Sequence, residues 1–373
     1  MQIEPFGVEQ WMNAHETNCA LNLAETCVHS LSIAELMALA GKNERDLSVL
    51  LPMRMTYGDI EGSLRLRTAI AALYAAQTPD NVVVTHGTIG ANALVHAALV
   101  SRGDRVVSIV PTYQQHYSIP ASIGAEVVPL RLRAEDGFLP DLDALAQMAK
   151  GARLIALTNP NNPTGALMGR EMLLQVAGIA RAEGAWVLCD EVYRGTEQEG
   201  DAVTPSIADL YEKGISTAGM SKAFSLAGLR LGWVCAPREV IDAVNIHRDY
   251  TTISVGMLND HFATMALEAA ERVLGRSRDI VRRNLAVLEE WVLATPGVSH
   301  VRRRAGTTSM VAYCRDIGSR AFCQRLLADT GVLFVPGEVF GMEGSVRVGY
   351  ACETEVLRQG LARVGAWLGA DRH

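Results

Sequence analysis

The sequence predicts an α/β protein, with a large domain built on a mostly parallel sheet flanked by helices and a smaller α+β domain. The chain has 373 residues, which is more than one ordinary hydrophobic core accommodates. Short apolar runs alternate with segments of helical periodicity over most of its length. Beyond about residue 251 this alternation gives way to a long helical stretch followed by scattered short strands.

The strands of the large domain are short apolar runs, rich in β-branched residues, and the helices lie between them. Because strands that alternate with helices form βαβ units, this order favours parallel pairing. We expect strands at Val82–Thr85, Arg105–Ile109, Glu126–Leu130, Leu154–Thr158, Ala185–Asp190, Ile215–Ser221 and Gly232–Ala236, with helices that include Gly90–Val100, Asp141–Met148 and Glu171–Ala182.

The C-terminal part predicts a different arrangement. We expect a helical region at Leu258–Thr295, strands at Ser309–Tyr313, Leu333–Val335 and Ser345–Gly349, and a last helix at Thr354–Leu368. The chain then divides into an N-terminal segment (1–45) that joins the small domain, a large domain (46–251) and a small C-terminal domain (252–373).

Composition excludes several classes of protein. The net charge of −7 disfavours nucleic acid or an anionic membrane as the main partner. No apolar run approaches the roughly 18 residues that cross a bilayer, and the acidic N-terminus does not resemble a secretory signal. The seven cysteines are odd in number, scattered and without a C-x-x-C pair, so we expect no metal site and a cytoplasmic location.

Ligands of open α/β sheets bind at the carboxyl ends of the strands, and four such ends carry informative residues. The first runs from Thr85 through Gly87 into a helix, where free backbone N–H groups favour an anion. A plain tight turn explains the glycine equally well, and His86 beside it is interpreted as structural. The second is the loop 158–165, whose prolines stiffen a segment that carries Asn162, the alternative being a structural turn.

The third strand end carries Asp190, with Tyr193 close behind. A buried carboxylate needs a partner, and a cationic ring nitrogen of a cofactor would be one; the alternative is an acid that caps a following helix. The fourth carries Lys222 and then Arg230. A lysine amine with a lowered pKa forms Schiff bases, and arginine binds phosphate, the alternative being a surface lysine beside a paired arginine.

Together these motifs resemble the class I/II aminotransferases, which are fold type I pyridoxal-phosphate-dependent enzymes. The motifs are N-P-N-N-P-T-G at 159–165, D-E-V-Y at 190–193 and S-K-x-F-x-x-x-G-x-R-x-G-W at 221–233. P-T-Y at 111–113, V-P-G at 335–337 and R-V-G-Y at 347–350 add to them. Within the family, 219–233 and 248–250 look most similar to capreomycidine-synthase-like and uncharacterised aminotransferase-like members.

The resemblance implies pyridoxal 5′-phosphate as the cofactor. Lys222 would form the Schiff base and move the proton between the substrate Cα and the cofactor. Asp190 would keep the pyridine nitrogen protonated, and Tyr113 would stack on the ring. Asn162 and Tyr193 would hydrogen-bond its phenolic oxygen.

For the phosphate, the resemblance implies contacts from the anion loop and from the segment around the lysine. One departure matters: many members carry a hydroxyl residue three positions before the lysine, and here that residue is Gly219. Either one donor is lost or Ser221 or Thr88 replaces it, so the roles of these two hydroxyls stay open. The implied phosphate and ring-edge contacts are Gly87, Thr88, Ile89, Ser221 and Arg230.

For the substrate, the resemblance implies that Arg347 clamps the α-carboxylate, with Asn162 beside it. Glu25 is a further candidate, because a carboxylate facing the ligand would favour a cationic side chain; the alternative is a solvated or helix-capping acid. His29 and His116 are candidates for the same side-chain pocket.

Tyr57 would reach the phosphate of the neighbouring subunit, which implies a homodimer with shared active sites. The expected function is transfer of the amino group of an α-amino acid to a 2-oxo acid through Lys222. An alternative with the same cofactor is β/γ-elimination or cyclisation of a substituted, guanidino-bearing amino acid. A third hypothesis, a silent effector-binding regulator, lacks a basic DNA-binding module in this sequence.

Overall fold

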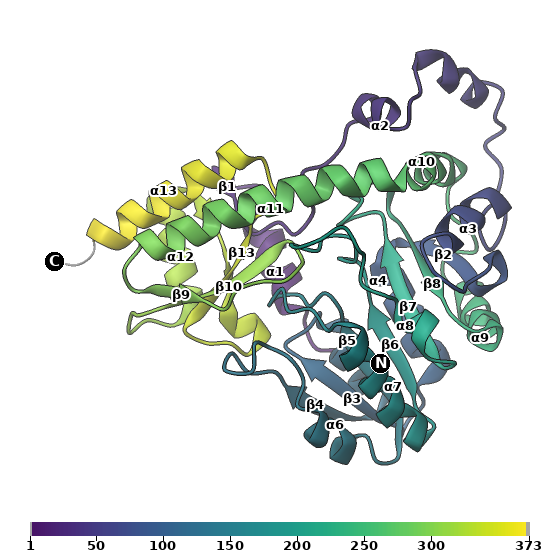
Figure 1. The fold of residues 1–373 in the computed structure, drawn as a ribbon, viewed down its shortest axis with the longest axis horizontal. Helices are drawn as coiled ribbons and strands as arrows, with labels where there is room; N and C mark the ends of the chain where they lie inside the picture. Colours follow the sequence, from purple (N-terminus) through teal and green to yellow (C-terminus); the bar gives the residue numbers. More distant parts are fainter. Residues whose placement is uncertain (1, 371–373) are drawn as a thin grey trace.

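A seven-stranded sheet forms the centre of the larger part of the computed structural model, which describes residues 2–370 (Figure 1). Every neighbouring pair of strands is parallel except the two pairs made by β8, which runs antiparallel to β2 and β7. The prediction of a mostly parallel sheet is confirmed. In spatial order the strands are β2 (Val82–His86), β8 (Leu231–Cys235), β7 (Gly214–Gly219), β6 (Trp186–Asp190), β5 (Ala152–Thr158), β3 (Arg105–Val110) and β4 (Glu126–Arg131).

Alternate residues of these strands pack on opposite faces, as the two-residue period of a strand requires. Val83 and Val234 pack in the same buried cluster as residues of α4 and α9. Their sequence neighbours Val84 and Trp233 pack on the other face, in a cluster with α3 and α10. Flanking helices are α3 (Leu64–Ala71), α4 (Gly87–Leu99), α5 (Gln115–Ile123), α6 (Leu142–Met148), α7 (Arg170–Glu183), α8 (Ile207–Leu210), α9 (Arg238–Arg248) and α10 (Met257–Glu268).

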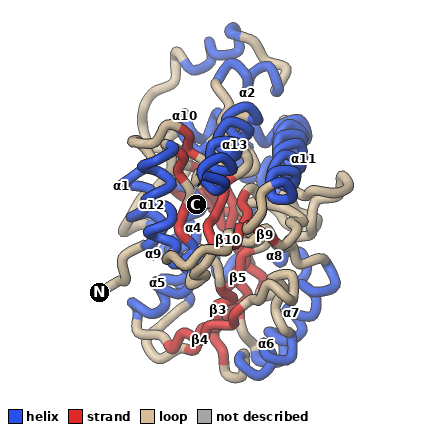
Figure 2. The backbone as a smooth tube through the Cα atoms, turned by 90° about the vertical axis from the view of Figure 1, so that its left-hand side faces the viewer, coloured by secondary structure: helices blue, strands red, loops and turns tan. Residues whose placement is uncertain are grey.

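The smaller part contains an antiparallel sheet of order β12-β13-β10-β9, covered by helices (Figure 2). The predicted strand 333–335 is divided in the structure: β11 pairs with β1 near the N-terminus, whereas β12 joins the four-stranded sheet. The elements are β9 (Val298–His300), β10 (Thr308–Tyr313), β11 (Val332–Leu333), β12 (Val335–Pro336), β13 (Ser345–Gly349), α12 (Ser319–Thr330) and α13 (Thr354–Ala370), together with α1 (Gly7–His15) and β1 (Leu21–Asn22).

One long helix connects the two cores. The sequence predicts a single helical region to Thr295, but the structure breaks it at Ala269, whose φ of −108° and ψ of 22° are not helical. The break separates α10 from α11 (Ala270–Ala294). The first turns of α11 bury Val273 against the core of the large sheet, and its later turns bury Leu288 against the small one. The bend at Ala269 therefore lets α10 stay on the large sheet while α11 crosses to the other core.

The N-terminal segment contributes to both cores. Trp11 and Leu23 lie in the buried cluster of the small sheet, whereas Leu36 in α2 (Ile33–Leu39) lies in a cluster of the large one. The chain between α2 and α3 projects from the body (Figure 1). The domain limits at residues 45 and 251 stay a prediction. Within residues 2–370, no helix is long and apolar enough to cross a membrane.

Candidate active site

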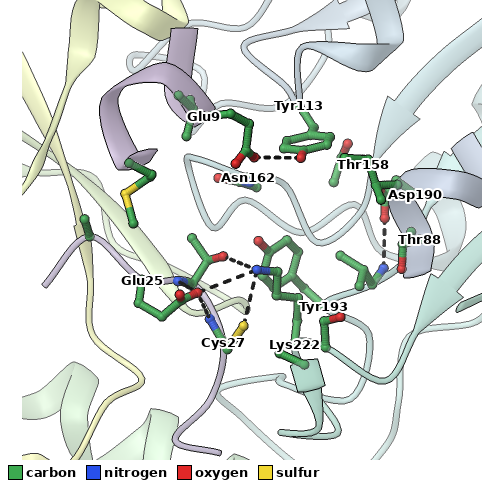
Figure 3. A pocket seen from close by; sticks show the side chains of 18 of the residues that line it. Glu9, Glu25, Cys27, Thr88, Tyr113, Thr158, Asn162, Asp190, Tyr193 and Lys222 are labelled. Atoms are coloured by element: carbon green, nitrogen blue, oxygen red, sulfur yellow. Dashed lines mark hydrogen bonds and ion pairs between the residues drawn. The ribbon is translucent and has the colours of Figure 1, made fainter. Parts of the chain in front are cut away.

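The carboxyl ends of the parallel strands open into one pocket, which has a volume of about 320 Å³. The small sheet contributes to it through β13, and the N-terminal segment crosses it (Figure 3). The strand ends chosen from the sequence therefore meet at one place. Of the predicted site residues, Glu25, Thr88, Ile89, Tyr113, Asn162, Asp190, Tyr193, Ser221, Lys222, Arg230 and Arg347 line this pocket.

Lys222 lies three residues beyond the end of β7, in a turn that carries its side chain into the middle of the pocket (Figure 3). Its Nζ donates a hydrogen bond of 2.6 Å to Thr26 Oγ1 and lies 3.4 Å from Cys27 Sγ and 3.7 Å from Glu25 Oε1. Burial alone would lower the pKa of this amine, but the neighbouring Cys27, Tyr193 and Glu25 outweigh it and raise the pKa.

Asp190 ends β6 and is held by neutral partners. Its Oδ2 accepts a hydrogen bond of 2.8 Å from Asn92 Nδ2, and its Oδ1 accepts one of 3.1 Å from the backbone N–H of Val192. Asn92 is oriented in turn by Thr217, whose hydroxyl donates to Asn92 Oδ1 at 2.6 Å. The carboxylate is 4% exposed, and no helix follows β6 directly. The alternative of a helix-capping aspartate is thus wrong, and Asp190 has capacity for a cation in the pocket.

His116 lies behind Asp190 and is fully buried, with Nε2 3.8 Å from Asp190 Oδ2. Its Nδ1 faces His96 Nε2 at 3.3 Å, and burial, reinforced by His116, holds the pKa of His96 well below its ordinary value. His116 is therefore not part of a side-chain pocket. His29 also lies outside the pocket lining, with Nε2 3.3 Å from Glu353 Oε1.

A group of donors suited to an anion lies at the end of the pocket away from Arg347. Helix α4 begins at Gly87, whose φ of 67° turns the strand into the helix and directs free N–H groups outward. Arg230 approaches the same turn: a Cβ at Gly87 would lie 3.0 Å from Arg230 Nη2. The hydroxyl of Thr88 is buried and makes no hydrogen bond within residues 2–370. These groups match a phosphate monoester, which needs several donors and positive charge.

The position of the Thr88 hydroxyl also explains why residue 219 is a glycine. A Cβ at this position would meet Thr88 Oγ1 at 2.5 Å, Leu231 O at 2.9 Å and Gly232 Cα at 3.1 Å. The space above residue 219 is thus filled by the Thr88 hydroxyl. That hydroxyl makes no hydrogen bond within residues 2–370 and Thr88 lines the pocket, so Thr88 stays a candidate for the missing donor beside Ser221, whose Oγ lies 3.5 Å from Arg230 Nη1.

We expect Gly219→Ser to lower the free energy of unfolding by about 1–3 kcal/mol, because the new side chain overfills a packed site. Thermal unfolding with and without cofactor measures it. The double variant Gly219→Ser/Thr88→Ala removes the worst contact and should recover part of the loss. If Gly219→Ser is as stable as the unchanged protein, the close packing over residue 219 is not a constraint.

The carboxylate-binding side of the pocket is formed by Arg347 on β13 and Asn162. Arg347 is 3% exposed, and its Nη1 donates to Asn162 Oδ1 at 3.3 Å and its Nη2 to Ala24 O at 3.0 Å. Its Nε has no partner within residues 2–370. Tyr113 borders this side, and its hydroxyl donates to Glu9 Oε1 at 2.9 Å. Burial, together with Glu9, raises the pKa of Tyr113 above its ordinary value, so the phenol stays protonated.

Sequence reasoning missed several pocket residues. Thr26 and Cys27 contact Lys222 from almost two hundred residues away, and no local pattern marks them. Asn92 had a usable signal, because it lies four residues after Thr88 on the same face of a helix. Two predicted residues do not line the pocket: Gly87 contributes backbone just before it, and the Tyr57 side chain is exposed. The other unpredicted lining residues are Val8, Glu9, Met12, Glu16, Ala24, Thr158, Val192 and Ala227.

Comparison with known proteins identifies the family. The model of the family "Aminotransferase class I and II" matches residues 36–364. The chain belongs to this family. A PLP-dependent aminotransferase from Streptococcus suis 89-1591 superimposes with a TM-score of 0.97 at 41% identity, over 100% of both chains. The capreomycidine synthase of Streptomyces vinaceus is 32% identical over 97% of this chain and 93% of its own. The PLP-dependent cyclase OrfR has a TM-score of 0.91 at 29% identity, over 99% and 98% of the chains.

Membership settles the fold type, the cofactor and the general reaction. The protein is a pyridoxal 5′-phosphate-dependent aminotransferase, and its substrates are an amino acid and a 2-oxo acid. The pocket fits this cofactor on its own evidence. The unpartnered Thr88 hydroxyl and the start of α4 suit a phosphate, the Asp190 carboxylate suits a ring cation, and the Lys222 amine lies between them.

Proposed function

We propose that the aminotransferase reaction runs on Lys222, between an aspartate that holds the cofactor ring and an arginine that holds the substrate carboxylate. The observation that carries the proposal is the position of Lys222 Nζ in one pocket with Asp190 and Arg347 (Figure 3). Lysine is the only side chain whose amine both forms a C=N bond and transfers a proton at the same place. Both tasks are required when an amino group moves between carbon atoms.

At the cofactor end, each group has a separate task. The start of α4, Thr88 and Arg230 bind the phosphate, and Ser221 and Ile89 border it. The Asp190 carboxylate pairs with the ring nitrogen and favours its protonated form. The bound cofactor supplies an electron sink for the negative charge that develops at the substrate Cα.

Three polar groups complete the ring site. Tyr193 is buried, and burial raises the pKa of its phenol, although Lys222 opposes the shift. Tyr193 would therefore donate a hydrogen bond to the phenolic oxygen of the cofactor, beside the amide of Asn162. Tyr113 covers the ring face, and its bond to Glu9 limits its rotation.

At the substrate end, Arg347 binds the α-carboxylate. Its guanidinium is buried and lines the pocket, and the fork of N–H donors on arginine is suited to a carboxylate. Its two bonds, to Asn162 and to Ala24 O, fix the orientation of the guanidinium. The same arginine serves the amino acid and the 2-oxo acid, because both carry that carboxylate. The Lys222 amine, which lies in the same pocket, would move the proton at Cα.

A single-turnover experiment tests the proposal. Protein loaded with cofactor is mixed with a panel of amino acids, and 2-oxo acid and free ammonia are measured. We expect one equivalent of 2-oxo acid per site without release of ammonia, because the amino group stays on the cofactor. Ammonia release with the cofactor regenerated, or no product from any amino acid, would contradict it.

An alternative outcome at the same site is elimination or cyclisation of a substituted amino acid. The observation that favours it is the similarity to capreomycidine synthase and to the cyclase OrfR over nearly the whole chain. All of these reactions begin with proton removal at Cα, so the residues around Lys222 serve them equally. The single-turnover products separate the two reactions: a lyase or cyclase gives no 2-oxo acid by amino transfer.

The proposed assembly is a homodimer in the cytoplasm, with active sites shared between subunits. Supporting it, apolar side chains are exposed along the projecting segment after α2, and Tyr57 on this segment is 74% exposed, away from the pocket of its own chain. A second copy would cover these side chains and bring Tyr57 to its phosphate site. All seven cysteines are free thiols, which suits a reducing compartment. The exposed apolar residues of the segment include Val49, Leu51, Met55 and Ile60.

A further inference from the structure

Three carboxylates from the N-terminal segment line the pocket: Glu9 on α1, Glu16 just after it, and Glu25 in the segment that crosses Lys222. In Figure 3, Glu9 and Glu25 lie on the side of the pocket opposite Asp190 and Thr88, with Lys222 between the two sides. The acids therefore border the substrate end and not the cofactor end. None of the three is required by the transfer of an amino group.

Once each positive side chain of the pocket is assigned a negative partner, the pocket still has negative side chains left over. Its positive side chains are Lys222, Arg230 and Arg347. With the roles proposed above, Arg230 is matched by the phosphate, Arg347 by the α-carboxylate, and the ring cation by Asp190. Lys222 gives up its ammonium when it bonds to the cofactor. Glu9 is half-buried and Glu16 and Glu25 are exposed, so these three lining acids give this end of the pocket a negative potential to which no positive side chain is assigned.

The local hydrogen bonds of Glu9 and Glu25 engage only one carboxylate oxygen of each. Oε1 of Glu9 accepts the Tyr113 hydroxyl, and Oε1 of Glu25 accepts the backbone N–H groups of Thr26 and Cys27 at 2.6 and 2.9 Å. These bonds orient the carboxylates but do not neutralise them. Burial opposes ionisation of Glu25, yet Lys222 and the N–H groups lower its pKa to about 2. The side chain is 46% exposed and keeps its two N–H donors, so Glu25 is charged at neutral pH even without the Lys222 ammonium.

A second feature of the same pocket points to a ligand. The Arg347 guanidinium is 3% exposed, lines the same pocket and is held in place by Asn162 Oδ1 and Ala24 O. A positive anchor on β13 and negative groups on the N-terminal segment are complementary to a molecule with a carboxylate at one end and a cation at the other.

We propose that the amino-acid substrate carries a positively charged side chain, a guanidinium or an ammonium, bound by Glu9 and Glu25, with Glu16 at the mouth of the pocket. This inference rests on the proposed function, because it takes Arg347 as the binding group for the α-carboxylate. It adds the substrate class: a basic α-amino acid. Neutral and acidic side chains leave the carboxylates unpaired or repelled.

Neutral analogues of two basic amino acids provide the test. The holoenzyme is assayed for kcat/KM with arginine against citrulline, and with lysine against norleucine. We expect at least one basic member to exceed its neutral analogue by about 10-fold or more, since hydrogen bonds between charged groups contribute free energies of that order. The arginine and lysine pairs distinguish guanidinium from ammonium recognition.

Two isosteric variants connect the selectivity to the acids. Glu9→Gln and Glu25→Gln keep an oxygen that accepts from Tyr113 or from the backbone but remove the charge. We expect each to reduce the basic-to-neutral ratio of kcat/KM by about 10-fold or more, and because the ratio is taken within one variant, any general loss of activity cancels. Glu239→Gln, on the exposed surface of α9, is the matched control and should leave the ratio unchanged.

A binding measurement supplies a readout that does not depend on turnover. The compound 5-guanidinopentanoate has the carboxylate and the guanidinium but no amine, so it cannot react. In calorimetry with the holoenzyme it should bind about 10-fold or more tightly than hexanoate, and Glu25→Gln should remove the difference. If the selective pair is lysine and norleucine, 6-aminohexanoate replaces the guanidino acid.

Separate results would overturn the inference and the proposed function. Equal kcat/KM for basic and neutral analogues, or equal losses for both in Glu9→Gln and Glu25→Gln, would reject the cationic substrate while leaving the aminotransferase reaction in place. Failure of every amino acid, basic, neutral or acidic, to yield a 2-oxo acid would instead reject the proposed roles of Lys222 and Arg347.

Discussion

Replacing Lys222 by arginine is expected to abolish turnover, with a loss in kcat of at least about 1,000-fold, the range that removal of an essential proton-transfer group produces. Arginine keeps the positive charge beside Glu25 and Thr26, but its guanidinium remains protonated and forms no C=N bond. The variant therefore separates charge from nucleophilicity. Steady-state kinetics gives the rate, and borohydride reduction followed by peptide mass spectrometry locates any cofactor adduct.

The matched control is Lys213→Arg. This lysine is half-buried and lies outside the pocket, donates to Gly184 O at 2.8 Å and lies over the Trp186 ring, so the same substitution should leave turnover unchanged. In the unchanged protein the reduced adduct should lie on Lys222 and be absent from Lys222→Arg. An adduct on another lysine, or a variant that retains a tenth of the original turnover, would contradict the assignment.

Replacing Asp190 by asparagine is expected to reduce kcat by about 1,000-fold, within the range seen when a charged catalytic partner is removed. The amide keeps the size of the side chain and its bond to the Val192 N–H, but it has no negative charge to favour a protonated ring nitrogen. The electron sink that the reaction requires is therefore weakened while the fold is retained. Stopped-flow rates of the amino-acid half-reaction measure the effect, and cofactor content is checked by absorbance.

Glu191→Gln is the control for Asp190→Asn. Glu191 is the next residue, is equally buried and accepts bonds from Ser206 and Ser216, but it does not line the pocket. Its amide variant should lower thermal stability and leave the half-reaction rate nearly unchanged at temperatures where it is folded. If both variants slow the half-reaction equally, the effect of Asp190→Asn is structural, and its assigned role fails.

The local pattern of apolar residues was sufficient to predict the strands of the large sheet. Its strands are buried runs such as Ile215–Gly219 and Val82–Thr85, and burial on both faces produces the apolar composition that the prediction used. The pattern did not reveal the break at Ala269 or the division of 333–335 between two sheets. Both depend on which distant segment each stretch packs against, and periodicity within a short window carries no such information.

The cofactor end of the site was likewise predicted from the sequence, because parallel strands bring their carboxyl ends to one edge. Asp190, Lys222 and Thr88 are each near a strand end, so their proximity follows from the topology alone. The chemistry of each residue type then restricts what it does: only lysine forms the C=N bond, and the chain has lysine at that position although arginines far outnumber lysines elsewhere.

Only the tertiary structure decided the substrate end. Glu9, Thr26 and Cys27 reach the pocket because the N-terminal segment packs into the core of the small sheet and crosses Lys222 on the way. The reason for Gly219 also appears only in three dimensions, where the Thr88 hydroxyl fills the space that a side chain would need. Sequence spacing describes neighbours along one strand or helix, whereas contacts across hundreds of residues are selected by how the two cores pack together.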